Sequence, residues 1–276
     1  MEEKTAGKAA GKEFPAEIFP HITRAWHWRR LVVCYGAASV IISSWTSYSP
    51  VRPYWDALDR QVFFLLNGSV AEAGWWQSVM AFANTRIFDA LSGAALVVIL
   101  LLYAFFGRKT TLAWRGAGIA FLGIYLLLSV FLRRKLGIGE FDRASPSVDL
   151  EPFFDMHGVL GDLWVKTKSS SCFPSDHANA AFLFIPLLWG LAGRKWGCAA
   201  LALVPVLVMP RLVGGGHWAT DILVGGTAFA LLVASWALFT PLFYWGMRLL
   251  HIPALWGLAL LTSLYSKIFR KDADSV

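Results

Sequence analysis

Six long runs of uncharged, mostly apolar residues dominate the hydrophobic pattern of this chain. They cover residues 31–51, 90–107, 116–132, 178–193, 196–209 and 222–239. A helix that crosses a bilayer needs about 20 apolar residues, within a usual range of about 17 to 25. The fifth run is short and contains Pro205, so it fits a span only inside a bundle. The pattern predicts an all-α fold, a polytopic membrane bundle of six transmembrane helices.

The remaining segments complete the predicted domain organisation. Residues 52–89 are amphipathic and predict helices on the outer surface, which we interpret as a structural cap rather than a substrate gate. Residues 1–30 predict a cytoplasmic N-terminal tail, and residues 31–248 a single membrane domain. Residues 249–276 predict an extra C-terminal helix, either interfacial or a seventh span, followed by a cytoplasmic tail.

Basic residues set the predicted orientation, because Lys and Arg in short connections mark the cytoplasmic side. The connections after the second and fourth runs and both tails hold Arg24, Arg29, Arg30, Arg108, Lys109, Arg115, Arg194, Lys195, Lys267, Arg270 and Lys271. With six spans, all of these residues lie on one side, so both termini are predicted inside. Residues 52–89, 133–177 and 210–220 are then predicted to face outward.

Composition supports the membrane interpretation and limits the others. The chain is 57% hydrophobic and 16% charged, whereas soluble domains carry about a quarter charged residues. Many of the 14 Trp residues fall near the ends of apolar runs, as in interfacial aromatic belts. The net charge of +7 therefore reflects topology, and we predict no nucleic-acid partner. Cys34, Cys172 and Cys198 lack the spacing of a disulfide framework or zinc site.

The stretch RLVGGGHWATD, residues 211–221, combines the parts of an activated nucleophile. His217 and Asp221 are four residues apart and share one face if the segment is helical. The carboxylate can then fix the tautomer of the imidazole and leave its other nitrogen free to attack. Arg211 precedes His217 by six residues, and the three glycines between them allow the backbone to approach a ligand. The guanidinium of Arg211 suits bidentate phosphate binding.

The stretch PSDH, residues 174–177, stands at the start of the fourth apolar run. Ser175 or Asp176 can cap this helix, and helix N-termini bind anions. A phosphate there could receive backbone N–H groups, the Ser175 hydroxyl and a proton from His177. On the same outward face lie four basic residues, Arg133, Arg134, Lys135 and Arg143. They oppose the positive-inside trend, and anion binding would explain them.

Each feature also has a simpler interpretation. A histidine near a span end is usually an interfacial residue, and a His–Asp pair can be a structural hydrogen bond. Arg133 and Arg134 could extend to lipid head groups. A metal site is a further alternative, built from His177, His217, Asp176 and Asp221. The convergence of three features on one membrane face favours an anion site without a metal.

Together, PSDH and the pattern R-x5-H-x3-D resemble the second and third motifs of the type 2 phosphatidic acid phosphatase family. These integral-membrane lipid phosphatases are related in their core to vanadium haloperoxidases. The resemblance covers residues 135–221 and agrees with the six-span layout. It implies that residues 31–248 form a membrane phosphatase domain.

The resemblance implies a role for each motif residue. His217 would attack phosphorus and form a phosphohistidine, Asp221 would orient it, and His177 would protonate the leaving oxygen. The phosphoryl oxygens would be held by Lys135, Arg143, Ser175 and Arg211 and by the backbone N–H of Asp176. No metal or other cofactor is implied, because the cations supply the electrostatic stabilisation.

The chain departs from the family pattern at three places. Seven residues separate Lys135 from Arg143 where the family has six, and Ala144 replaces a proline. Alternatives to Lys135 are Arg134, Lys166 and Lys168. Asp176 replaces the commoner glycine, which puts a carboxylate beside the expected phosphate. Pro210 replaces the usual serine, which removes one hydroxyl contact.

These features predict a membrane lipid phosphatase of the bacterial inner membrane, with its active site facing the periplasm or exterior. Candidate substrates are undecaprenyl diphosphate, lipid A phosphate and glycerophospholipid phosphates. One alternative is a phosphotransferase that passes the phosphoryl group to another lipid or a sugar. A second is a non-catalytic lipid transporter or scaffold. The predicted partners are the lipid substrate and the bilayer, with no obligatory protein partner.

Overall fold

The computed structural model describes residues 14–107, 111–137, 139 and 141–270, and these residues form helices and loops without extended strands. The helices are α2 (Trp28–Trp45), α3 (Arg52–Gly68), α4 (Trp75–Ala83), α5 (Arg86–Phe106), α6 (Leu112–Leu136), α7 (Pro146–Asp149), α8 (Asp176–Ala192), α9 (Arg194–Ala202), α10 (Val204–Val213), η1 (Asp221–Gly226), α11 (Thr227–Phe239) and α12 (Leu242–Arg270). The short η1 segment is π-helical and continues directly into α11. The predicted all-α fold is confirmed.

Within the part of the chain that the structure describes, four helical stretches are long and apolar enough to cross a membrane. They are Arg86–Phe106, Leu112–Leu136, Arg194–Val213 and Asp221–Phe239. These stretches are α5, α6, α9 joined to α10, and η1 joined to α11. Their length and apolar character indicate a membrane protein. The other two predicted spans are shorter helices, α2 with 18 residues and α8 with 17. The count of six spans therefore stays a prediction.

Two helices differ in length from the apolar runs that predicted them. α2 ends at Trp45, six residues before the predicted edge, because the chain then turns through residues 46–51 into α3. α6 continues beyond its apolar run, so its last turn carries Arg133, Arg134 and Lys135. Cations at a helix C-terminus complement the helix dipole, which explains why the basic stretch extends the helix instead of forming a loop.

The fifth apolar run forms two helices in line. α9 ends before Leu203, and α10 begins next to Pro205, which has no N–H to donate to the preceding turn. α10 then continues through Pro210 to Val213. Arg211, in the segment 210–220 that is predicted to face outward, therefore lies in the last turn of a helix.

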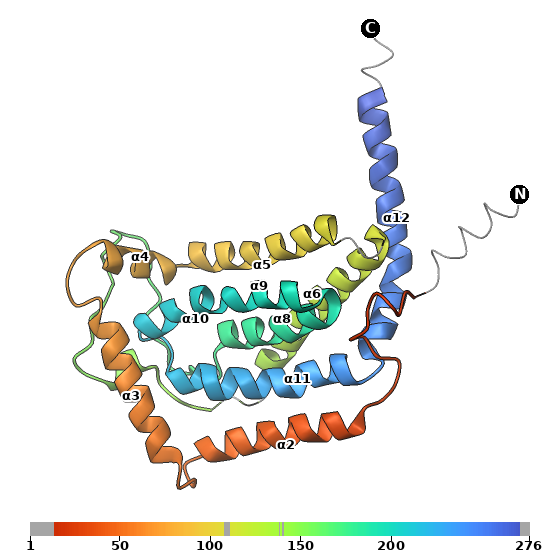
Figure 1. Ribbon diagram of the computed structural model, residues 1–276. Helices are drawn as coiled ribbons and strands as arrows, with labels where there is room; N and C mark the ends of the chain where they lie inside the picture. The colour runs from red at the N-terminus through yellow and green to blue at the C-terminus, as the bar shows by residue number, and fades with distance from the viewer. Residues whose placement is uncertain (1–13, 108–110, 138, 140, 271–276) are drawn as a thin grey trace, which may run out of the picture.

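The centre of the bundle is α8, which packs against α6, α9 and α11 (Figure 1). Its side chains Phe184, Leu187 and Leu188 are fully buried. Small residues allow close approach: a Cβ at Gly190 would lie 2.6 Å from a methyl group of Leu238. Close packing of small residues is a main source of helix association in a bilayer, where apolar burial offers little gain.

The two ends of the bundle differ in what they carry (Figure 1). At one end lie α3 and α4, the starts of α5 and α8, and the end of α10. At the other end lie the first described residues and α12, which runs across the direction of the bundle helices. Phe14 packs against Trp114 and Tyr244, so part of the predicted N-terminal tail belongs to the core. The helix α12 begins at Leu242, so no helix boundary falls at residue 249.

The predicted basic side of the protein corresponds to the α12 end. The end of α5, the start of α6 and the connection between α8 and α9 lie there, with Arg115 and Arg194 at the starts of helices. Arg108, Lys109 and Lys271, which were used for the same prediction, lie outside the described residues.

Candidate active site

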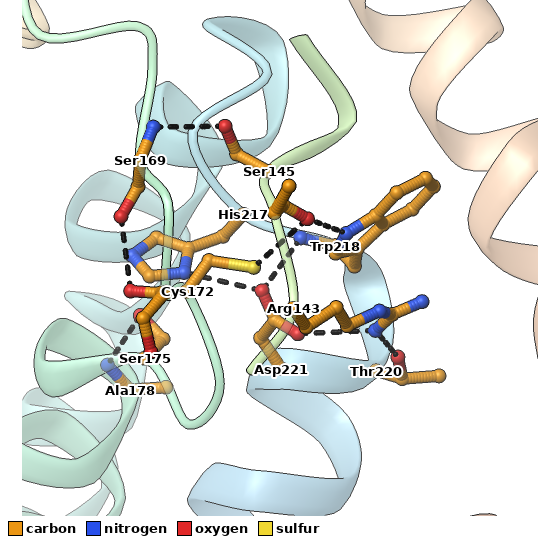
Figure 2. Close-up of polar contacts among 12 residues, drawn as sticks. Arg143, Ser145, Ser169, Cys172, Ser175, Ala178, His217, Trp218, Thr220 and Asp221 are labelled. Carbon is orange, nitrogen blue, oxygen red and sulfur yellow. Dashed lines mark hydrogen bonds and ion pairs between the residues drawn. The ribbon is translucent and has the colours of Figure 1, made fainter. Parts of the chain in front are cut away.

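The imidazole of His217 and the carboxylate of Asp221 form a pair at the start of η1 (Figure 2). Nδ1 of His217 lies 3.2 Å from Oδ2 of Asp221. The backbone N–H of Trp218 donates to the same oxygen at 2.9 Å. Asp221 is fully buried, so its position is fixed. The other ring nitrogen of His217 points away from Asp221 (Figure 2) and is available as a nucleophile.

A second histidine group lies at the start of α8. Nε2 of His177 is 3.0 Å from Oδ1 of Asp89, in the first turn of α5. Nη2 of Arg211 donates to the same oxygen and lies 3.3 Å from Nε2 of His177. Nη1 of Arg211 donates to Oδ1 of Asn84 at 3.1 Å. Arg211 is thus held by Asn84, which precedes α5, and by Asp89, which lies in the first turn of α5.

Arg143 connects the His217–Asp221 pair to α3. Its guanidinium donates to Oδ2 of Asp59 at 2.6 Å, to Oγ1 of Thr220 at 2.8 Å and to Oδ1 of Asp221 at 3.2 Å. It also lies over the ring of Trp218, 4.4 Å from the centroid. Burial raises the pKa of Asp59, and Arg143 and Thr220 oppose that rise. Arg143 therefore supports Asp221 in this structure and is itself largely buried.

Asp176 forms ion pairs with the end of α6. Its carboxylate accepts from Nη2 of Arg133, and Nη1 of Arg134 lies 3.6 Å from its other oxygen. This explains how a carboxylate is tolerated in the PSDH stretch. Ser175 caps α8, where its hydroxyl accepts from the N–H of Ala178 at 3.5 Å. Lys135 is exposed to the surroundings on the next position of α6.

Side chains from three of these groups, among them His217, His177 and Asp176, line one cavity of about 360 Å³. It is lined by Arg133, Arg134, Lys166, Lys168, Ser169, Ser171, Cys172, Phe173, Pro174, Asp176, His177, Arg211, Gly216 and His217. The lining brings both predicted histidines together with five cationic side chains and one carboxylate. Among the described residues, Lys135 and Arg143 do not line it, whereas the alternatives Arg134, Lys166 and Lys168 do. Phosphate binding by Lys135 stays a prediction without support from its position.

Glycines allow the two motifs to meet. A Cβ at Gly225 would lie 2.5 Å from Cβ of Pro174, so η1 packs directly on the start of α8. A Cβ at Gly214 would lie 2.8 Å from the amide of Asn84, and Gly215 has a positive φ of 67°. Both conditions require glycine. The glycine stretch thus packs closely against Asn84, the partner of Arg211, and its Gly216 lines the cavity.

The predicted four-residue metal site is not assembled among the described residues. Asp176 pairs with Arg133 instead, and the one group with metal-ligand spacing there is Cys172, His217 and Asp221, whose ligand atoms lie within 4.8 Å of one another. Burial raises the pKa of the Cys172 thiol, and the negative charge of Asp221 acts in the same direction. With the thiol protonated and Arg143 bonded to Asp221, this group fits a cation poorly.

Sequence reasoning missed three supporting residues: Asp59, Asn84 and Asp89. All three come from the segment that was interpreted as a structural cap. Asp59 and Asn84 are buried and bond to residues more than 80 positions away in the sequence. In the sequence, each of them appears only as a polar residue in a mostly apolar segment. Amphipathic surface helices show the same pattern.

The chain is also similar in sequence to known proteins. Residues 146–245 match the PAP2 superfamily, and the match includes both histidines and Asp221. Among curated proteins, the chain is similar to the lipid A 1-diphosphate synthase of Escherichia coli (strain K12). The two are 32% identical over 204 residues, which cover 72% of this chain and 82% of the relative. No solved structure matches the chain significantly. On this similarity, and with the two motifs meeting in one cavity, the chain belongs to the PAP2 superfamily, whose members include membrane lipid phosphatases.

Proposed function

We propose that this protein is a lipid phosphatase that acts through a phosphohistidine on His217. The supporting observation is the His217–Asp221 pair beside His177 in a cavity with five cationic side chains. A cavity of this charge suits a lipid phosphate or diphosphate, with undecaprenyl diphosphate, lipid A phosphate and glycerophospholipid phosphates as candidates. The cavity lies near helix ends, so the lipid tails can stay in the bilayer.

The proposed reaction has two steps. Nε2 of His217 attacks phosphorus, the bond from phosphorus to the lipid oxygen breaks, and His177 gives its proton to that oxygen. Water then attacks the phosphohistidine, His177 takes the proton from the water, and the phosphorus–nitrogen bond breaks to release inorganic phosphate. Arg211 and the N–H groups at the start of α8 stabilise the charge on the phosphoryl oxygens. We propose no metal for either step.

The orientation of the protein is part of the proposal. The positive connections at the α12 end support a cytoplasmic location for that end. The cavity then faces the periplasm or exterior of the inner membrane. Labelling of single cysteines introduced near Lys168, with a reagent that does not cross membranes, is expected in intact cells. Labelling only after lysis would contradict this orientation.

The chemical proposal is tested with purified protein in detergent that contains EDTA. Brief reaction with a lipid carrying a labelled terminal phosphate should place the label on His217, stable to alkali and released by acid. His217→Ala is expected to lose both the label and phosphate release, while His157→Ala, in an exposed loop position, keeps both. Full activity in His217→Ala would refute the mechanism, and loss of wild-type activity in EDTA would refute metal independence.

A second candidate function is phosphoryl transfer to another lipid. The observation that favours it is the similarity to a lipid A 1-diphosphate synthase, a name that describes formation of a diphosphate on a lipid. Both functions share the phosphohistidine and differ in the acceptor of the second step. Incubation with a labelled lipid diphosphate, with and without lipid A, separates them. Label in lipid A indicates transfer, and label only in inorganic phosphate indicates hydrolysis.

A further inference from the structure

Asp89 joins the two cavity residues that come from different motifs. It lies in the first turn of α5, one turn after the capping residue Thr85. One oxygen of its carboxylate accepts from Nη2 of Arg211 and lies 3.0 Å from Nε2 of His177. Asp89 is 57 residues before the start of the segment that matches the PAP2 superfamily at residue 146. The family motifs therefore do not account for it.

The surroundings of His177 disfavour its protonated form, and Asp89 opposes this effect. Nη2 of Arg211 is 3.3 Å from its Nε2, and a guanidinium is always charged. A second positive charge on the imidazole is disfavoured at this distance. Burial lowers the pKa of His177, and Arg211 and His217 add to this effect, whereas Asp89 raises the pKa through its hydrogen bond and charge. A proton donor in this position needs a nearby anion.

The other charged groups around the cavity do not supply that anion. Arg133 and Arg134 from α6 and Lys166 and Lys168 from the loop before α8 are cationic. Asp176, the one carboxylate in the described lining, is paired with Arg133. Asp89 is thus the carboxylate in contact with His177 among the described residues.

We infer that Asp89 is a positioning residue for proton transfer: its carboxylate holds Arg211 and His177 side by side and lets His177 carry a proton beside a guanidinium. Asp89 is not part of the described cavity lining, so it acts through these two residues rather than on the lipid. The inference rests on the proposed function only where it concerns catalysis. The contacts of Asp89 with Arg211 and His177 do not depend on that function.

The catalytic test compares Asp89→Asn with the wild type in rapid-quench measurements of phosphohistidine formation. The rate near pH 7 is expected to fall by at least about tenfold, which is part of the ~10²–10⁴ that a general acid contributes in full. The decline of the rate with rising pH should begin at lower pH than in the wild type. Asp89→Glu should recover part of the rate. Asp56→Asn is the matched control, because it removes a carboxylate paired only locally with Arg52, and should leave the profile unchanged.

A second measurement does not depend on catalysis. The pKa of His177 is followed by NMR in full-length protein with labelled histidine rings, with His177→Gln used to assign the signal. Asp89→Asn should lower this pKa and Asp56→Asn should not. An unchanged pKa in Asp89→Asn would overturn the inference, whether or not the wild type forms a phosphohistidine. A lowered pKa in a protein that forms none would support the positioning role and refute the proposed function.

Discussion

Gly225 of η1 lies against Pro174 so closely that a Cβ on residue 225 would come within 2.5 Å of Cβ of the proline. The contact sets the spacing between the segment that carries His217 and the helix that carries His177. The two cavity walls can approach this closely because residue 225 is glycine, which carries a hydrogen atom where alanine carries a methyl group. Because interiors are close-packed and deform little, a side chain at this position must move one wall.

Gly225→Ala is accordingly expected to reduce phosphate release by about tenfold or more, since small misplacements of catalytic groups are costly. Gly93→Ala provides the control, because a Cβ there meets nothing within 4 Å. Both variants exchange glycine for a better helix former, so a loss specific to Gly225→Ala reports the packing contact. Equal activity of the two variants would show that the walls can adjust.

Asp176→Asn is expected to strengthen inhibition by inorganic phosphate several-fold. The change removes the carboxylate that pairs with Arg133 and Arg134 and raises the positive potential of the cavity. The measurement is the inhibition constant of phosphate against lipid hydrolysis at low and high salt, because screening should reduce the difference. Asp162→Asn, in an exposed loop position, is the control. A weaker inhibition in Asp176→Asn would mean that the aspartate orders the arginines for binding.

Asp59→Ala is expected to lower the free energy of unfolding by about 3–5 kcal/mol, because it leaves the buried Arg143 without its closest partner. It also removes the acceptor for the backbone N–H and the hydroxyl of Thr220. Denaturant-induced unfolding in mixed micelles provides the measurement. Asp56→Ala, whose side chain is half-exposed, should change the free energy by less than about 1 kcal/mol. Similar values for both variants would contradict the central place of the Asp59–Arg143 pair.

Phosphohistidine formation is expected to decline with rising pH from a point below about pH 6.5, the ordinary histidine value. Burial lowers the pKa of His177, with Asp89 opposing and Arg211 assisting, and a general acid must be protonated to act. The rate therefore falls as the pH rises through the lowered pKa. His177→Gln should form the intermediate more slowly and without this decline. A rate that increases above pH 7 would assign the proton to another group.

The sequence was sufficient to predict the helical fold and, in the cavity lining, both histidines and Arg211. Spacing within short segments fixed the His217–Asp221 pair, because residues four apart stay close in almost any helical turn. The apolar runs located α5, α6 and α11 to within a few residues, since length and apolar character alone decide whether a helix can span.

The sequence could not predict which distant residues support these parts. The partners of Arg143 and Arg211 include Asp59 in the middle of α3, Asn84 just after α4 and Asp89 in the first turn of α5. No periodic pattern shows that these polar residues turn inward. The choice between Lys135 and the loop lysines also depended on three-dimensional position. Lys135 directly follows Arg134 on α6. One residue along a helix rotates the side-chain direction by about 100°, so Lys135 points away from the cavity that Arg134 lines.

The position of Asp59 early in the chain has a consequence for synthesis. Its partners Arg143 and Thr220 are encoded 84 and 161 residues later. Burial of a charged aspartate without a partner is costly, so the buried position of Asp59 depends on residues that are synthesised much later. A chain truncated before η1 would also lack Asp221, the partner of His217.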